Sequence, residues 1–265
     1  MSKSIDIGQS SPASVLRDPR IVSGNSGDEY VLSCNDLRKS YRKANVEIPV
    51  LRGVDLSIRE GEFTAVIGQS GSGKSTMLHL LATLDRPDRG EIYLRGQRID
   101  NLAPRRRDEL RNHQISMVFQ FYHLLPELTT VENVLLPSMI SHSAWSYWAK
   151  KREFRRRATE LLETVGLGHR LKHRPRELSG GEMQRVAIAR SLMQDPKILL
   201  ADEPTGNLDQ KTGREIMAIL RNLNQNQGLT IVMVTHDQSV AEQSDTVFRM
   251  SEGRIETEQR VRRAS

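Results

Sequence analysis

The amino-acid sequence predicts an α/β fold with a mainly parallel sheet, and two observations support this. Short apolar runs rich in β-branched and aliphatic residues recur along the chain, and stretches with apolar residues at helical spacing separate them. Buried strands that alternate with helices are typical of a parallel sheet covered by helices. A further segment, 54–58, alternates apolar and polar residues, which predicts a half-buried strand. The apolar runs span residues 63–67, 115–119, 198–201 and 231–234.

The pattern along the chain predicts one main domain with two polar ends. Residues 1–28 are rich in Ser, Gly, Asn and Asp without periodicity, which predicts a disordered leader. Residues 29–255 carry the strand and helix signals, and within them 121–177 show much helix and little strand. We therefore expect a helical subdomain inserted into the α/β core. Residues 256–265 are charged and lack an apolar pattern, which predicts a polar tail.

Composition limits the class of protein. The chain has 265 residues, of which 37% are hydrophobic and 27% charged, and its mean hydropathy is -0.51. That balance is typical of a soluble globular protein, and no stretch reaches the roughly 18 to 20 apolar residues of a spanning helix. No apolar segment typical of a secretory signal is visible near the start. The single cysteine, Cys34, excludes an internal disulfide and suits a reducing cytosol. If a membrane is involved, we expect a partner to connect the chain to it.

The formal net charge of +6 is compatible with nucleic acid, anionic lipid or a nucleotide ligand. Basic residues cluster at 105–107 and across 150–157. No aromatic residues alternate with them as a stacking platform would require, so we expect no nucleic-acid partner. The second cluster lies in a helix-like segment and is interpreted as a solvated face, while attraction to an anionic membrane surface stays open.

A glycine-rich segment carries the strongest chemical signal. Residues 68–76 match the P-loop pattern G-x-x-x-x-G-K-[ST], with a predicted buried strand before it and a helical pattern after it. Glycines let backbone N–H groups approach phosphate oxygens, and the following helix points its N-terminus at the same anion. Lys74 would add positive charge at the β- and γ-phosphates, and the Ser75 hydroxyl suits Mg²⁺. A simple glycine turn explains neither residue. The candidate nucleotide-binding residues here are Gly68, Gln69, Ser70, Gly71, Ser72, Gly73, Lys74, Ser75 and Thr76.

Two adjacent acids end another predicted strand. Asp202 and Glu203 follow the apolar run 198–201, and ligands of open α/β sheets bind at the carboxyl ends of strands. Asp202 is a candidate partner of Mg²⁺, and Glu203 is a candidate to orient and polarise an attacking water. Such groups could supply the positioning and charge stabilisation that phosphoryl transfer needs. Alone, an acidic pair after a strand is usually a loop start or a helix cap, so the interpretation depends on the P-loop.

A third signal lies before a further helical pattern. Ser179 can cap this helix, and the N–H groups of Gly180 and Gly181 are free to meet an anion. The simplest alternative is an ordinary capped helix. A second phosphate-binding element on a chain with one P-loop makes sense if it serves the nucleotide of a neighbouring copy.

Together these segments resemble the ABC ATPases. Residues 178–185 resemble the family's LSGGQ signature, although Met183 departs from the commoner polar residue at its position. The resemblance covers about residues 30–255. The other family marks occur in the expected order: Tyr41 resembles the adenine-stacking aromatic, Gln120 the Q-loop glutamine, 206–209 the D-loop and His236 the switch histidine.

The resemblance implies a P-loop NTPase core of the ABC type, with an antiparallel β subdomain and the inserted helical subdomain. ATP and Mg²⁺ would be the cofactors, with Ser75, Gln120 and Asp202 as metal-site residues. Two copies would close head to tail around two MgATP, and closure would move membrane permease subunits through a groove near Gln120. Each site would take Lys74, Ser75, Gln120, Asp202, Glu203 and His236 from one chain and Ser179, Gly180 and Gly181 from the other.

Finer motifs narrow the resemblance within the family. Segments 84–87, 122–126, 128–134, 173–178 and 202–209 are similar to the group that contains lipoprotein-releasing, macrolide-export and cell-division ATPases. The resemblance is strongest to the lipoprotein-releasing type, which implies a peripheral location on the cytoplasmic side of the inner membrane and lipoprotein cargo handled through permease subunits. The alternatives are a macrolide or peptide exporter and a cell-division complex.

More distant alternatives fit the sequence less well. Repair-type ABC proteins carry a long heptad coiled coil and translation types carry two P-loops, and neither feature occurs here. Glu203 and His236 argue against a module that binds ATP without hydrolysing it.

A few other residues fit structural roles better than chemical ones. His169 and His173 are four residues apart, but two ligands without a nearby carboxylate or thiol make a poor zinc site. Trp145 and Trp148 could contact a coupling helix of a membrane partner, although core or ordinary surface positions need no special account. Cys34 is expected to be a small buried hydrophobe.

Overall fold

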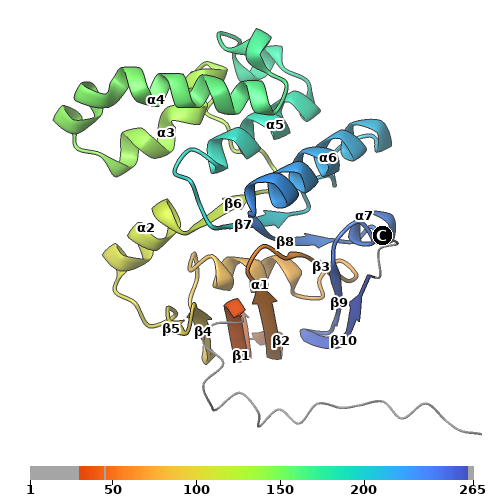
Figure 1. Ribbon diagram of the computed structural model, residues 1–265. Coiled ribbons are helices and arrows are strands. Elements are labelled where there is room, and N and C mark those ends of the chain that lie inside the picture. The colour runs from red at the N-terminus through yellow and green to blue at the C-terminus, as the bar shows by residue number, and fades with distance from the viewer. Residues whose placement is uncertain (1–29, 45, 262–265) are drawn as a thin grey trace, which may run out of the picture.

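The computed structural model describes residues 30–44 and 46–261, and it contains two sheets covered by helices (Figure 1). The predicted leader, residues 1–28, lies outside the described residues. In chain order the elements are β1 (Tyr30–Lys43), β2 (Val46–Arg59), β3 (Phe63–Ile67), α1 (Lys74–Leu81), β4 (Arg89–Leu94), β5 (Gln97–Arg98), α2 (Pro104–His113), β6 (Ile115–Val118), α3 (Thr130–Ser141), α4 (Ala144–Thr164), η2 (Gly168–Arg170), η3 (Pro175–Glu177), α5 (Gly180–Ser191), β7 (Ile198–Asp202), α6 (Gln210–Gln227), β8 (Thr230–Thr235), α7 (Gln238–Ala241), β9 (Thr246–Ser251) and β10 (Arg254–Arg260).

The central sheet has six strands in the order β10-β9-β3-β8-β7-β6. Strands β9, β3, β8, β7 and β6 are parallel, and only the edge strand β10 runs antiparallel to its neighbour. The four apolar runs of the sequence form β3, β6, β7 and β8, so the predicted parallel sheet is confirmed. Every residue of β3, β7 and β8 is buried, which is why these strands read as continuous apolar runs instead of alternating ones.

Each face of this sheet packs against a different hydrophobic core. Along β3, Phe63, Ala65 and Ile67 point into the core that contains α5 and α6, while Val66 points into the core that contains α1. Side chains of successive strand residues point to opposite faces, so one strand contributes to both cores. As a result α1 and α5 lie on opposite sides of the sheet (Figure 1).

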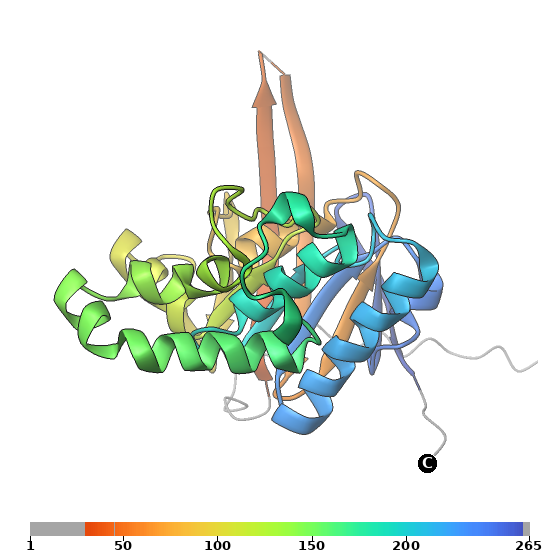
Figure 2. The same ribbon diagram turned by 90° about the horizontal axis from the view of Figure 1, so that it is seen from above.

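The second sheet is antiparallel and has the order β2-β1-β4-β5. Its strand β2 contains the segment 54–58, in which Val54, Leu56 and Ile58 are buried while Asp55 is exposed and Ser57 is partly exposed. The predicted half-buried strand is therefore confirmed. Beyond this covered part, β1 and β2 continue as a long hairpin that projects from the rest of the molecule (Figure 2).

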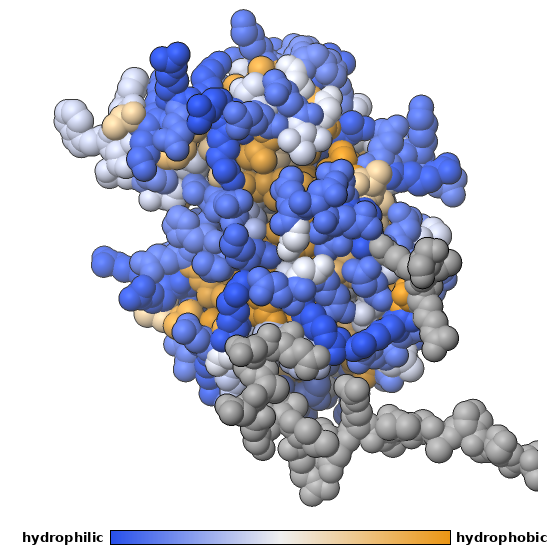
Figure 3. Space-filling model, viewed as in Figure 1, coloured by the Kyte–Doolittle hydropathy of each residue, from blue (hydrophilic) through white to orange (hydrophobic). Residues whose placement is uncertain are grey.

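Helices fill the segment between β6 and β7. Residues 121–177 contain α3 and α4 and no strand, and both helices pack against α5. Thr129 and Glu132 form a capping box that starts α3, and Ser143 caps α4 through the backbone N–H of Ser146. Together α3, α4 and α5 form a layer above the sheet in Figure 1, and hydrophilic residues cover most of the same face of the molecule (Figure 3).

The structure differs from the sequence prediction at the C-terminal end. Residues 256–260, expected to belong to a polar tail, are part of β10, which pairs with β9. Most side chains of β10 are exposed, so the strand depends on backbone pairing at a sheet edge and leaves no apolar pattern in the sequence.

Two other predictions concern membrane spans and the cysteine. Among residues 30–44 and 46–261, none of the helices combines the length and apolar character that crossing a membrane requires. Cys34 is fully buried in the core beneath α1, as predicted, and burial raises the pKa of its thiol.

Asn224 is a buried polar residue that joins α6 to the central sheet. Its side-chain amide donates hydrogen bonds to the carbonyl oxygens of Gly61 at 2.7 Å and Leu229 at 2.9 Å. Its carbonyl oxygen accepts one from Arg221 at 3.1 Å. The turn before β3 and the turn before β8 are therefore held by a single side chain.

We predict that Asn224→Ala lowers the free energy of unfolding by about 1–3 kcal/mol, because buried carbonyl groups lose their donor. Asn222→Ala, an exposed site on the same helix, makes the same change in helix propensity without removing these bonds. It should change stability by no more than about 0.5 kcal/mol. Urea denaturation followed by circular dichroism measures both, and equal losses in the two variants would contradict the assigned role.

Candidate nucleotide-binding site

The glycine-rich loop connects β3 to α1 in a conformation that requires its glycines. Gly73, the N-cap of α1, has φ +103°, and Gly71 has φ +81°, both in the left-handed region that favours glycine. At Gly68 a Cβ atom would lie 2.2 Å from the carbonyl oxygen of Met250. The loop is therefore pressed against the end of β9, and its backbone can approach a ligand closely on the other side.

Lys74 begins α1 and folds back over this loop. Its ammonium group donates to the carbonyl oxygens of Gly68 at 2.8 Å and Gln69 at 3.0 Å, and the residue is buried. The positive charge thus lies inside the loop curvature, at the N-terminus of a helix. Cationic charge, loop N–H groups and the helix dipole all favour an anion at this place.

Ser75 and Asp202 join the P-loop helix to the end of β7. The Ser75 hydroxyl donates to Asp202 Oδ1 at 2.8 Å, and Asp202 is nearly fully buried. A hydroxyl and one carboxylate beside a phosphate site suit Mg²⁺, which takes oxygen ligands and keeps several waters. The residue types and their placement therefore fit the predicted magnesium site.

Glu203 and His236 meet at the ends of neighbouring strands β7 and β8. Nδ1 of His236 lies 2.8 Å from Oε2 of Glu203, and the Glu203 backbone N–H donates to the Val234 carbonyl at 3.0 Å. Glu203 has φ +47°, a left-handed backbone that costs a non-glycine residue on the order of 1–3 kcal/mol. The chain turns at Glu203 and so ends β7, while the Glu203 carboxylate lies beside the His236 imidazole.

Gln120 lies just after β6, which is an edge strand of the central sheet and pairs with β7. Its backbone carbonyl accepts a hydrogen bond from the side-chain amide of Asn207 at 3.1 Å. The segment that resembles the Q-loop is thereby connected to the segment that resembles the D-loop.

Tyr41 lies on the projecting part of β1, close to the start of α1. Its hydroxyl donates to Asp85 Oδ2 at 3.0 Å, and 42% of the residue is exposed. Partial burial and then the hydrogen bond to Asp85 raise its pKa, while a smaller opposing effect comes from Thr76 in the P-loop helix. An exposed ring beside the P-loop helix is compatible with stacking on a base.

Ser179, Gly180 and Gly181 form the start of α5. The Ser179 hydroxyl accepts from the Glu182 N–H, and the Glu182 carboxylate accepts from the Ser179 N–H at 2.8 Å. These bonds to Ser179 lower the pKa of Glu182, which also pairs with Arg170 at 2.9 Å. At Gly181 a Cβ atom would lie 2.2 Å from the Thr212 methyl group, so this helix start packs tightly against α6. Met183, the departure from the signature pattern, packs against the core under α5.

The structure brings some predicted residues together and separates others. Lys74, Ser75 and Asp202 form one cluster. Glu203 and His236 lie next to it, just after the C-terminal ends of β7 and β8. Ser179, Gly180 and Gly181 lie in the helical layer on the opposite side of the sheet from α1 (Figure 1).

The sequence prediction omitted one residue of the site, His79. Its Nε2 lies 3.9 Å from Asp202 Oδ2, and its ring is 6.3 Å from that of Phe119. The spacing held a signal, because His79 follows Ser75 by four residues and therefore shares its face of α1.

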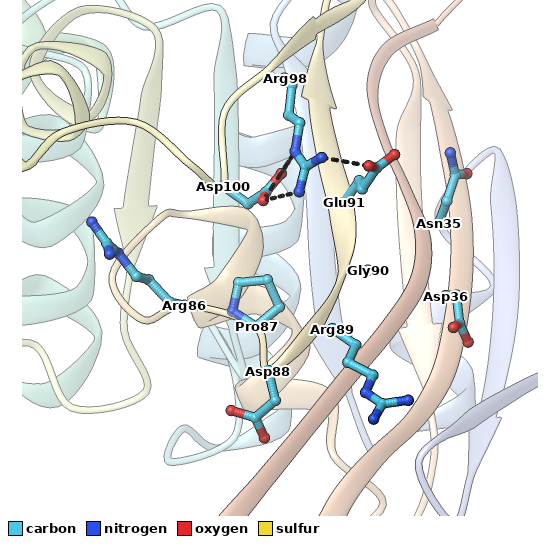
Figure 4. Close-up of a pocket in the computed structure, with 10 residues that line it drawn as sticks. All are labelled: Asn35, Asp36, Arg86, Pro87, Asp88, Arg89, Gly90, Glu91, Arg98 and Asp100. Atoms are coloured by element: carbon cyan, nitrogen blue, oxygen red, sulfur yellow. Dashed lines mark hydrogen bonds and ion pairs between the residues drawn. The ribbon is translucent and has the colours of Figure 1, made fainter.

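A polar cavity of about 560 Å³ lies elsewhere, beside the antiparallel sheet (Figure 4). It is lined by residues of β1, β4 and the turns around them, and none of the predicted site residues takes part. Within its lining, Arg98 forms ion pairs with both Asp100 and Glu91. The cavity is therefore distinct from the P-loop.

The fold and the P-loop cluster define a nucleotide-binding ATPase, and comparison with known proteins identifies its family. Residues 51–206 match the family model described as ABC transporter. The chain therefore belongs to the ABC transporter family, and it is an ATP-binding subunit of the ABC type that hydrolyses ATP.

Several relatives are similar over most of the chain. The lipoprotein-releasing system ATP-binding protein LolD 2 of Rhodopirellula baltica is 56% identical over 88% of this chain and 91% of the relative. The macrolide export ATP-binding/permease protein MacB of the same organism is 49% identical over 85% of this chain but only 32% of the relative. Among solved structures, a dimeric ATP-binding cassette in a post-hydrolysis state with ADP and phosphate is 39% identical, with a TM-score of 0.79 over 88% of this chain and 100% of that one.

We predict that Lys74→Ala nearly abolishes ATP binding, because the loop loses the buried cation that would offset the negative charge of the phosphates. Lys197→Ala, an exposed position before β7, should bind ATP like the wild type. Isothermal titration of both variants with ATP measures the effect, and melting curves without nucleotide verify that each is folded. Wild-type affinity in a folded Lys74→Ala variant would contradict the P-loop assignment.

Proposed function

We propose that this ATPase powers the release of lipoproteins from the inner membrane toward the outer membrane, as a peripheral subunit on the cytoplasmic side. The observation that carries the proposal is the similarity to LolD 2, at 56% identity over 91% of that protein. The LolD proteins of Pseudomonas syringae and Pseudomonas fluorescens are 47% and 46% identical, each over 98% of the relative. Export of a macrolide or peptide is the second candidate, favoured by the 49% identity to MacB.

The P-loop cluster holds the triphosphate in this proposal. Loop N–H groups and Lys74 bind the phosphate oxygens, and the carbonyl bonds of Lys74 to Gly68 and Gln69 show that its ammonium already lies in the loop. Ser75 and Asp202 would hold Mg²⁺, which neutralises charge on the phosphates when it is bound. The half-exposed ring of Tyr41 would stack on the adenine.

Glu203 and His236 act on the water. The Glu203 carboxylate accepts hydrogen bonds, so the His236 tautomer with its proton on Nδ1 would donate one to Glu203 Oε2. This bond orients the carboxylate, whose remaining acceptor positions can orient and polarise the attacking water. Gln120 would complete the polar side of the site near the metal.

A second copy of the chain supplies the other wall. Ser179, Gly180 and Gly181 are separated from the P-loop of their own chain by the central sheet, so they can cover only the nucleotide of a partner. The capped start of α5 presents free N–H groups for this purpose. Closure of two such chains would move the attached permease subunits, which choose the cargo.

We predict that Glu203→Gln reduces ATP turnover by at least about 100-fold, because the water loses its orienting carboxylate while the binding groups are intact. The variant should then accumulate as an ATP-bound dimer in size-exclusion chromatography with light scattering. Glu256→Gln, on the exposed edge strand β10, is the matched control and should turn over normally. Wild-type turnover in Glu203→Gln would remove Glu203 from the mechanism, and a strictly monomeric ATP-bound form would contradict the shared site.

We predict that depleting this protein in its own cells leaves lipoproteins in the inner membrane, because no ATP hydrolysis drives their release. Membrane fractionation and lipoprotein immunoblots measure the distribution. Wild-type protein should restore it and Glu203→Gln should not. Normal lipoprotein sorting together with raised macrolide sensitivity would instead support the export function.

A further inference from the structure

The end of the helical layer carries large apolar side chains that the fold leaves exposed. Trp145 is 90% exposed and Trp148 67% exposed, both in the first turns of α4. Ile140, at the end of α3, is 75% exposed. The α3–α4 turn lies at the far edge of the helical layer, away from the central sheet (Figures 1 and 2). The ATP site uses none of these residues.

Basic residues continue the same face of the helix. Trp145, Trp148, Arg152 and Arg155 follow each other at intervals of three or four residues, so they lie along one stripe of α4. Lys151 belongs to this stripe through its ammonium group, which lies 4.4 Å from the centre of the Trp148 ring. Further along α4, Ala158 and Leu162 are buried and pack into the core, whereas the first turns of the helix extend beyond this packing.

The charge of this stripe is not neutralised within the described chain. From 150 to 157 there are six Lys or Arg residues and one acid, Glu153. The stripe residues Lys151, Arg152 and Arg155 form no ion pair with any residue in 30–44 or 46–261, whereas Arg156 pairs with Glu160 and Arg157 with Asp195. The surface combines unpaired cations with exposed tryptophans.

We infer that the α3–α4 end of the helical layer binds the surface of an anionic lipid bilayer. Tryptophan favours the boundary between headgroups and acyl chains, because its ring is apolar and its N–H is polar. Cations beside it are attracted to anionic headgroups, and an amphipathic helix face with aromatic and basic residues is the usual form of such a contact. A protein groove would fit the two tryptophans, but it would not account for several unpaired cations along the same stripe.

Intrinsic fluorescence tests this inference directly, since the chain has only two tryptophans and both lie in the stripe. Full-length protein is titrated with vesicles of 30 mol% phosphatidylglycerol in phosphatidylethanolamine and, separately, with pure phosphatidylcholine vesicles. We expect a shift of the emission to shorter wavelength and co-sedimentation with the anionic vesicles only. Binding should weaken as salt is added, because exposed charges are screened beyond about 10 Å at 0.1 M ionic strength.

Two double variants distinguish lipid binding through this stripe from a general effect of the net charge of the protein. Lys151→Glu/Arg152→Glu should weaken vesicle binding by at least about tenfold. Arg254→Glu/Arg260→Glu makes the same change of charge on β10, at the opposite edge of the central sheet from β6, and should bind like the wild type. Basal ATP turnover, measured without lipid, should be unchanged in both and verifies that they are folded.

Three results would overturn the inference. They are no binding to anionic vesicles, equal loss of binding in the two double variants, and binding only to membranes that contain permease subunits. The last result would assign the stripe to a protein partner. None of these outcomes depends on the cargo, so lipoprotein release and lipid binding are tested separately.

Discussion

The hydrogen bond between Ser75 and Asp202 is the contact on which the site depends. It connects the first turn of the P-loop helix to the end of β7, so the P-loop and the adjacent acids Asp202 and Glu203 keep a fixed relation. Asp202 is nearly fully buried, and the end of the same strand also positions its neighbour Glu203. The parallel sheet makes this possible, because the P-loop, the two acids and His236 follow the C-terminal ends of β3, β7 and β8, which lie on the same side of the sheet.

The same sheet also divides the protein into two functional halves. Phe63 and Val66 of one strand belong to different hydrophobic cores, one beneath the helical layer and one around α1. This arrangement keeps the start of α5 away from its own P-loop. In the proposed mechanism, the P-loop of one copy would therefore meet the start of α5 of a second copy.

The main strands and the P-loop were predictable because each leaves a local pattern. Runs such as 63–67 are apolar throughout since both faces of the sheet are covered, and the loop glycines are fixed by backbone angles and by the closeness of Met250. Strand β10 was not predictable, because an edge strand with exposed side chains is stabilised by backbone pairing. The approach of His79 to Asp202 depends on how α1 packs against β7, and the bond from Asn207 to Gln120 joins residues 87 positions apart. Residue spacing places His79 on the same face of α1 as Ser75, but it does not show which distant residue such a side chain meets.

The burial of Cys34 determines how the enzyme responds to oxidants and thiol reagents. Its sulfur is fully buried and bonded to the Val54 carbonyl, and burial raises the pKa of the thiol, so almost no thiolate forms near neutral pH. Oxidants and alkylating reagents attack the thiolate form of an accessible cysteine. Because the chain has no other cysteine, its folded form offers such reagents no reactive sulfhydryl, and ATP turnover should be indifferent to the thiol redox balance of its surroundings.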